Sequence, residues 1–168
     1  MRCTCWVKPS SEPSRCFVES VAIRNKIRYD SSVTISERQD ELLEELNLFQ
    51  DWTERYEYII GLGKKLPPMD QALQTEDHLI KGCQSQVWLD ASLVDGKMHY
   101  LADSDSLITK GMIALFIRIL NGQTARDVLS TELTFIEKTG LKEHLAPTRA
   151  NALTLMAAQM RKCALEAS

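Results

Sequence analysis

The sequence lacks long apolar runs and an excess of basic residues. No apolar stretch reaches the roughly 18 residues that a membrane-spanning helix needs, and the most apolar one, residues 112–120, is interrupted by Arg118. The net charge is −3, and no basic patch alternates with aromatic residues in the body of the chain. Proteins that hold nucleic acid through phosphate contacts usually carry such a patch. We therefore expect neither a membrane nor nucleic acid as a partner.

Common catalytic and ligand-binding motifs are also missing. The chain has no Gly-rich phosphate loop, paired-histidine metal motif or Gly-x-Ser-x-Gly elbow, which removes the commonest nucleotide, zinc and serine-hydrolase interpretations. Cys3, Cys5 and Cys16 lack a fourth ligand at zinc-site spacing, so we expect no metal site. What remains is a chain of 168 residues, 44% of them hydrophobic, which fits one domain with a substantial core.

Composition divides the chain near residue 32. Residues 1–30 contain six Lys or Arg and three acids, together with two prolines and three of the five cysteines, and they show no sustained apolar periodicity. They also lack the apolar core of a secretory signal, so these cysteines do not indicate an oxidising compartment. We interpret residues 1–32 as a poorly ordered leader or a misassigned start, and residues 33–168 as the domain.

Three explanations of the leader remain open. Translation begins at Val33, because a valine codon can serve as a bacterial start; or the segment is an organelle transit peptide, which its acids Glu12, Glu19 and Asp30 fit poorly; or it is a disordered tail. We expect a cytoplasmic protein, or an organellar one if residues 1–32 are a transit peptide. Mass spectrometry of the native N-terminus distinguishes the three.

The domain should begin and end with helices. Thr34 and Glu37 form a capping box, and apolar residues then recur at intervals of three and four as far as Ile59, with a break near residues 47–50. Gly61 and Gly63 weaken this helix near its end, and residues 64–77 connect it to the next element. A further helix is predicted from Leu107 to Ile119, and Asn121-Gly122 ends it. Others are predicted from Thr124 and over residues 131–138, the second of which Gly140 stops. The last begins at Pro147 and buries Cys163.

A β-hairpin is predicted between these helices. Val87, Leu89, Ala91 and Leu93 alternate with other residues, and Asp95-Gly96 is a strong signal for a tight turn before residues 97–102. A lone hairpin is marginal in water, so it should gain another strand or pack against the helices. The predicted fold class is α+β, with a small antiparallel β-sheet packed against N-terminal and C-terminal helices.

Cys83 is the residue best placed for chemistry. A thiol becomes nucleophilic as the thiolate, and Lys81, His78 or a distant arginine could lower its pKa. Gly82 permits an unusual backbone angle or lets the loop swing. These observations alone leave two alternatives open, a reactive thiol and a merely buried one.

The segment Gly82-Cys83-Gln84-Ser85-Gln86-Val87-Trp88 resembles the signature of the SufE family of sulfur acceptors. His78 precedes it, and Asp103-Ser104-Asp105 and Lys110-Gly111 follow it. The resemblance extends more loosely from Tyr56 to Arg149 and so covers most of the chain after Thr34. Gly61 and Ala152 depart from the pattern, since an acid and a glycine are usual at those positions.

The resemblance implies that Cys83 accepts sulfur as a persulfide from a SufS-type cysteine desulfurase, stimulates that enzyme and delivers sulfur to scaffold proteins of iron–sulfur cluster assembly. The protein would then be a sulfurtransferase-type carrier rather than a stand-alone enzyme. It would hold no cofactor, because the pyridoxal phosphate belongs to the desulfurase. A CsdE-like acceptor that feeds another sulfur pathway is a close alternative.

Supporting roles follow from the same resemblance, each beside a structural alternative. Arg149 would hold the loop or stabilise a thiolate, or is a surface residue of a first helical turn. His78 would contact the loop or cap local backbone, and Gln84 and Ser85 would supply loop hydrogen bonds. Asp103 belongs to the family's Asp-x-Asp, although helix capping explains it sufficiently.

Two functions of other classes remain as rivals. One is a thiol hydrolase or peroxidase with Cys83 as nucleophile and His78, His99 or His144 as base, although no spacing supports such a pair. The other is a module that binds the desulfurase without any chemistry of its own.

Overall fold

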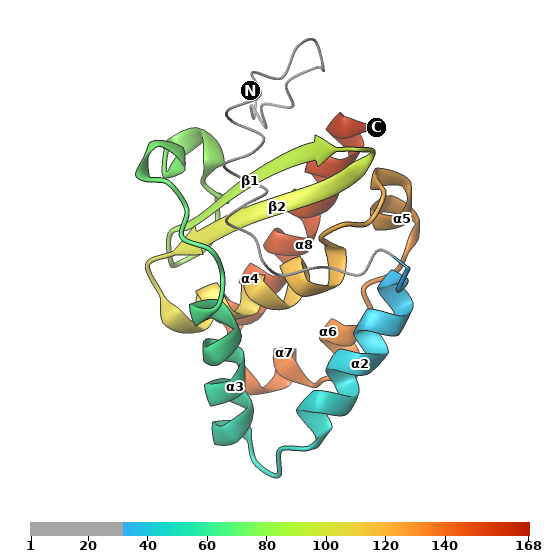
Figure 1. Cartoon of the computed structure of the whole chain (residues 1–168). Coiled ribbons are helices and arrows are strands. Elements are labelled where there is room, and N and C mark those ends of the chain that lie inside the picture. The colour runs from blue at the N-terminus through green and yellow to red at the C-terminus, as the bar shows by residue number, and fades with distance from the viewer. Residues whose placement is uncertain (1–31) are drawn as a thin grey trace.

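Helices surround a single β-hairpin in this computed structural model, which describes residues 32–168 (Figure 1). The hairpin crosses the top of the view in Figure 1, with α4 (Leu107–Leu120) and α8 (Pro147–Ala167) packed against it, while α2 (Ile35–Asn47) and α3 (Trp52–Lys64) lie on opposite sides below. This arrangement confirms the predicted α+β class. The leader predicted for residues 1–32 lies, apart from Ser32, outside the described residues.

The first helix begins where its predicted cap places it. The Thr34 hydroxyl accepts a hydrogen bond from the Glu37 amide at 3.3 Å, and the Thr34 amide donates to the Glu37 carboxylate at 2.7 Å, so the capping box is confirmed. The predicted break near residues 47–50 is also present. Asp51 caps α3 by accepting a hydrogen bond from the Glu54 amide at 2.9 Å.

Helices α3 and α4 cross at two glycines. A Cβ atom on Gly63 would lie 2.7 Å from the Gly111 amide nitrogen, and a Cβ on Gly111 would lie 2.5 Å from the Ile59 carbonyl oxygen. Both distances are too short for carbon, so each position requires glycine for the two backbones to approach this closely. Gly63 therefore has a packing role that helix propensity alone does not reveal.

Strands β1 (Val87–Val94) and β2 (Lys97–Ser104) form a two-stranded antiparallel sheet. Asp95 and Gly96 both have positive φ (51° and 76°), as a type I′ turn requires, so the predicted hairpin is confirmed. Of its two predicted means of stabilisation, packing against helices is the one observed: the Tyr100 hydroxyl donates to the Met160 carbonyl of α8 at 2.9 Å.

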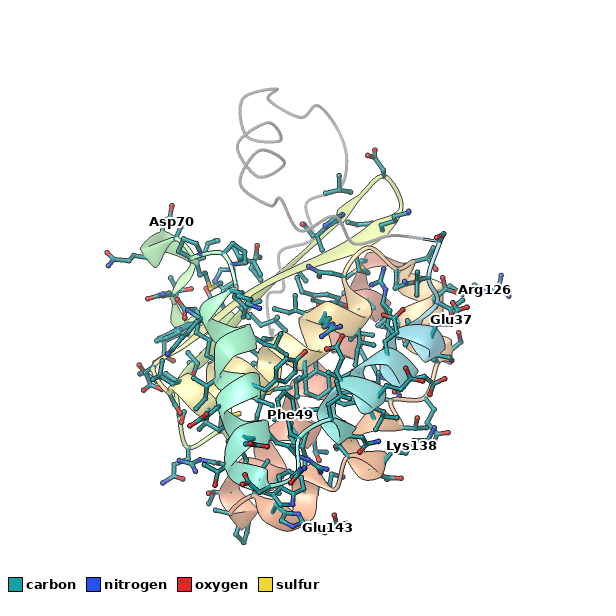
Figure 2. The ribbon with its side chains drawn as sticks, turned by 60° about the horizontal axis from the view of Figure 1, so that its bottom comes forward. Glu37, Phe49, Asp70, Arg126, Lys138 and Glu143 are labelled. Atoms are coloured by element: carbon teal, nitrogen blue, oxygen red, sulfur yellow. The ribbon has the colours of Figure 1, made fainter. Side chains whose placement is uncertain are left out.

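The inward-facing residues of β1 are buried only as far as Ala91. Val87, Leu89 and Ala91 are buried, but Leu93 is 40% exposed. The reason is geometric, because the tip of the hairpin projects beyond the helices, as Figure 2 shows.

The C-terminal region contains α5 (Ala125–Ser130), α6 (Phe135–Lys138), α7 (Leu141–His144) and α8. The helix predicted over residues 131–138 is shorter than expected. The Gln39 side chain of α2 donates to the Glu132 carbonyl and accepts from the Phe135 amide, both at 3.1 Å, and so replaces hydrogen bonds that a longer helix would make. Gly140, with φ 69°, separates α6 from α7. Helix α7 itself was not predicted.

The remaining predictions for the helices are confirmed. Asn121 ends α4, the Thr124 hydroxyl caps α5, Pro147 opens α8, and Cys163 is fully buried. Among the described helices, none is long and apolar enough to cross a membrane.

Candidate functional site

The segment that contains Cys83 is a loop closed at its base. The Ile80 amide donates to the Val87 carbonyl at 2.8 Å, and Leu79 forms an isolated antiparallel bridge with Trp88. Ile80 and Val87 are both buried. Residues 81–86, called the cysteine loop below, therefore bulge from a fixed base at the start of β1.

Cys83 is half-buried and packs against the hydrophobic core. Burial raises the pKa of its thiol, because removing water disfavours the thiolate. The predicted lowering of this pKa by Lys81, His78 or an arginine is wrong for this conformation, since no cation of the described residues offsets the effect of burial. The thiol is sheltered and held mainly in its neutral form.

Gly82 has a backbone conformation that favours glycine. Its φ of +91° lies in the left-handed region, which confirms the predicted unusual backbone angle. A Cβ on Gly82 would also lie 3.1 Å from Cδ1 of Leu155, a half-buried residue of α8. The loop thus rests on α8 at this position.

The other end of the cysteine loop is held by hydrogen bonds. The Gln86 amide donates to the Asp105 carboxylate at 3.0 Å, and the Ser104 hydroxyl donates to the Gln86 carbonyl at 2.7 Å. The Thr109 hydroxyl donates to Ser85 Oγ at 3.3 Å. Ser85 therefore takes part in loop hydrogen bonding as expected, whereas Gln84 is exposed.

Asp103 does not cap a helix, and the prediction that it does so is wrong. Ser106 is the N-cap of α4, because its hydroxyl accepts from the Thr109 amide at 3.5 Å, while Asp103 lies one residue before the end of β2. The Asp103 carboxylate instead forms an ion pair with Lys110 at 2.7 Å and accepts from the Gln74 side chain at 3.2 Å. It joins α4 to the segment that leads into the cysteine loop.

His78 makes local contacts. Its Nδ1 lies 2.9 Å from the Thr75 hydroxyl, and its Nε2 lies 3.6 Å from the Asp90 carboxylate of β1. Both contacts are with side chains outside the cysteine loop, so they match neither of the two predicted roles, contact with the loop or capping of local backbone.

Arg149 is exposed in the first turn of α8. Burial raises the pKa of the nearby Tyr56 phenol, and the charge of Arg149 opposes that effect. The structure thus places Arg149 beside Tyr56 and agrees with the surface alternative predicted for it.

No described histidine is hydrogen-bonded to Cys83. His99 lies opposite Ser92 in the hairpin, and the His144 ring stacks on Trp52 with 3.8 Å between ring centroids. A thiol enzyme needs a base within hydrogen-bonding reach of its nucleophile. The described residues therefore do not form a Cys–His pair at Cys83.

Four residues around the loop were missed as site residues. Ser104 and Asp105 belong to the Asp103-Ser104-Asp105 motif, so a signal for them was present. Thr109 and Leu155 carry no local signal, because they approach the loop only when α4 and α8 pack against it.

Comparison with known proteins relates the chain to one family. The SufE family, described as an Fe-S metabolism associated domain, matches residues 40–164. An uncharacterised SufE-like protein of Synechocystis is 38% identical over 121 residues, which are 72% of this chain and 76% of that protein. A second, from Rhizobium meliloti, is 34% identical over 122 residues, or 70% of this chain and 87% of the relative.

A plant relative and a solved structure extend the comparison. SufE-like protein 1, chloroplastic/mitochondrial, of Arabidopsis thaliana is 36% identical over 141 residues, which are 82% of this chain but 38% of that longer protein. The solution structure of a hypothetical protein from Thermus thermophilus covers 77% of this chain and 95% of its own, with a TM-score of 0.65 and 20% identity, and shares the fold. By its family match and these relatives, the chain belongs to the SufE family, whose domain is associated with Fe–S metabolism.

Proposed function

We propose that this protein accepts sulfur on Cys83 from a SufS-type cysteine desulfurase, stimulates that enzyme and delivers the sulfur to Fe–S scaffold proteins. The observation that supports this most is the position of Cys83, a half-buried thiol in a closed loop with a glycine beside it. Membership of the SufE family supplies the link to Fe–S metabolism.

The transfer is a thiol exchange without net oxidation. The Cys83 thiolate attacks the terminal sulfur of the desulfurase persulfide, the sulfur–sulfur bond of the donor breaks, and the donor cysteine leaves as a thiolate. Cys83 then carries a persulfide, whose proton is the one that the donor persulfide brought. The step uses no metal, nucleotide or cofactor of this chain, because the pyridoxal phosphate that frees sulfur from cysteine resides in the partner.

Burial suits a carrier between its two partners. A neutral, half-buried thiol resists oxidation in the free protein, since thiolate character and exposure determine susceptibility. Docking to the desulfurase would have to expose Cys83 and restore water or a cation near it. Such a requirement limits reaction to the correct partner.

The proposal also covers the compartment in which the protein works. We place the protein in the cytoplasm, and the alternative is an organelle, in line with the word chloroplastic/mitochondrial in the name of the plant relative. A CsdE-like role in another sulfur pathway remains the nearest alternative, and affinity capture of the cognate desulfurase distinguishes the two.

The test is incubation with a SufS-type desulfurase, cysteine and pyridoxal phosphate, followed by peptide mass spectrometry. We expect one added sulfur atom on Cys83 and faster desulfurase turnover, both lost in Cys83→Ser and both kept in Cys163→Ala, which removes the buried thiol of α8. Full stimulation by Cys83→Ser would contradict the proposal and indicate a binding module. Cys83-dependent turnover of an ester, amide or peroxide by the protein alone would indicate a thiol enzyme.

A further inference from the structure

The two arms of the cysteine loop are held in different ways. The C-terminal arm, Ser85 and Gln86, is tied by four hydrogen bonds to Ser104 at the end of β2, to Asp105 and to Thr109 of α4. The N-terminal arm, Lys81 and Gly82, is exposed, and the contact described for it is apolar. The loop therefore has one polar, directional attachment and one that depends on packing alone.

The apolar attachment comes from one side chain of α8. Both methyl groups of Leu155 lie within 4.0 Å of the position that a Cβ on Gly82 would occupy, the nearer at 3.1 Å. Leu155 is itself half-buried and packs against the core, so its position is fixed by the helix. Gly82 leaves no side chain between the loop backbone and these methyl groups.

From this asymmetry we propose that Leu155 is a latch, a positioning residue that holds the N-terminal arm of the cysteine loop against α8 and keeps Cys83 sheltered. Release of Gly82 from Leu155 lets the arm move while Ser85 and Gln86 stay attached. The importance of the latch for sulfur transfer rests on the proposed function, but its effect on the exposure of Cys83 does not.

An apolar latch suits this task better than a hydrogen bond. Packing contacts are individually weak and non-directional, so an arm held by them can leave without a buried polar group losing its partner. A docking protein needs only to supply a competing apolar surface. The polar attachment at Gln86 meanwhile keeps the moving cysteine in register with β1.

The latch predicts how fast a small reagent reaches Cys83. The rate of alkylation by iodoacetamide, followed by peptide mass spectrometry at fixed pH, should rise about fivefold in Leu155→Ala, which corresponds to about 1 kcal/mol for the partly buried methyl groups removed. Leu155→Met nearly conserves side-chain volume and should keep the wild-type rate. This pair separates the packing contact from any other effect of the position.

Leu153→Ala is the matched control. Leu153 lies two residues earlier in the same helix, roughly 200° around the helix axis from Leu155, and is fully buried, so its truncation should cost more stability than that of Leu155. Its Cys83 alkylation rate should stay at the wild-type value. Cys163, fully buried in α8, reports in the same spectra whether the fold as a whole has loosened.

Sulfur transfer gives a second measurement. In assays with the desulfurase, Leu155→Ala should lower the concentration of acceptor needed for half-maximal stimulation by a similar factor. The maximal rate should not change. The reason is that less of the binding free energy is needed to open the loop. Dithiothreitol should also reduce the Cys83 persulfide about fivefold faster, because the reductant reaches it through the same opening of the loop.

Two results would overturn the latch. One is an unchanged Cys83 alkylation rate in Leu155→Ala, and the other is a rise that Leu153→Ala or Cys163 shares. If instead the wild-type protein never acquires sulfur from the desulfurase, the proposed function fails, while the alkylation series still decides whether Leu155 holds the loop.

Discussion

At the scale of single residues, the state of the Cys83 thiol is controlled by its surroundings rather than by a partner group. Burial raises its pKa, and no hydrogen bond from a described histidine activates it. A carrier benefits from this arrangement, because the free thiol should not react before its donor is bound. The desulfurase complex, not the free protein, would then be the place where a thiolate forms.

The pH dependence of alkylation tests this control. Burial favours the neutral thiol, so at a given pH the folded protein holds less thiolate than the unfolded chain. The pH at which the Cys83 alkylation rate reaches half its maximum should lie above roughly 8.5, the pKa of an unperturbed cysteine. In guanidinium chloride it should return toward that value. A folded midpoint at or below the unfolded one, measured by peptide mass spectrometry, would show that a cation activates Cys83.

Sequence reasoning located this residue but not its state. The Gly82-Cys83 pair and its resemblance to a family identified the thiol, and the need for an unusual backbone angle at Gly82 followed from residue type. The direction of the pKa shift depends on packing against elements far along the chain, such as α8. The same holds for Asp103, whose partners Lys110 and Gln74 come from different segments.

At the scale of elements, the crossing of α3 and α4 depends on glycines that local sequence rules misjudge. In a helix interior, glycine costs about 1 kcal/mol relative to alanine. Gly61 obeys that rule, since a Cβ there would have no neighbour within 4 Å. Gly63 does not, because the backbone of α4 occupies the space that its Cβ would need.

The two glycines should therefore respond to alanine in opposite directions. Gly61→Ala should raise the free energy of unfolding by about 0.5–1 kcal/mol through helix propensity. Gly63→Ala should lower it by about 1–3 kcal/mol, because α3 and α4 must move apart. Urea unfolding of both variants measures the difference. Stabilisation by Gly63→Ala would mean that the crossing is looser than the structure shows.

Element types and caps were predictable for most of the domain, because they follow from local signals. The capping box at Thr34, the Asp95-Gly96 turn and the end of α4 at Asn121 all lie where residue types place them. The extent of α6 was not predictable from local signals, because the Gln39 side chain from α2 makes hydrogen bonds that compete with those of a longer helix. Long-range polar contacts of this kind leave no local pattern.

At the scale of the whole molecule, two arginines join α4 to the N-terminal helices α2 and α3. Arg38 of α2 is buried and donates to the carbonyls of Ile119 and Asn121, at 3.2 and 2.6 Å, where the C-terminus of α4 favours a cation. Arg118 of α4 pairs with Glu45 of α2 at 2.5 Å, and both bond to Tyr58 of α3. Three helices thus meet at one charged cluster.

This cluster makes stability depend on pH in a defined direction. The hydrogen bond from Arg118 holds the pKa of Glu45 below its usual range, so the carboxylate contributes stability at neutral pH, and that stability is lost as pH falls through the lowered pKa. Because Glu45 is more than a third exposed, we expect Glu45→Gln to cost about 1 kcal/mol or less at neutral pH.

Urea unfolding at neutral and acid pH tests the contribution of the cluster. The difference in unfolding free energy between wild type and Glu45→Gln should shrink toward zero once the pH lies below the lowered pKa of Glu45, because the carboxyl is then protonated in both the folded and unfolded states. Glu44→Gln, which removes the carboxylate of the exposed neighbour in α2, is the matched control. If the cost of Glu45→Gln were the same at both pH values, it would arise from packing rather than charge. The junction of α2, α3 and α4 would then not depend on ionisation of Glu45.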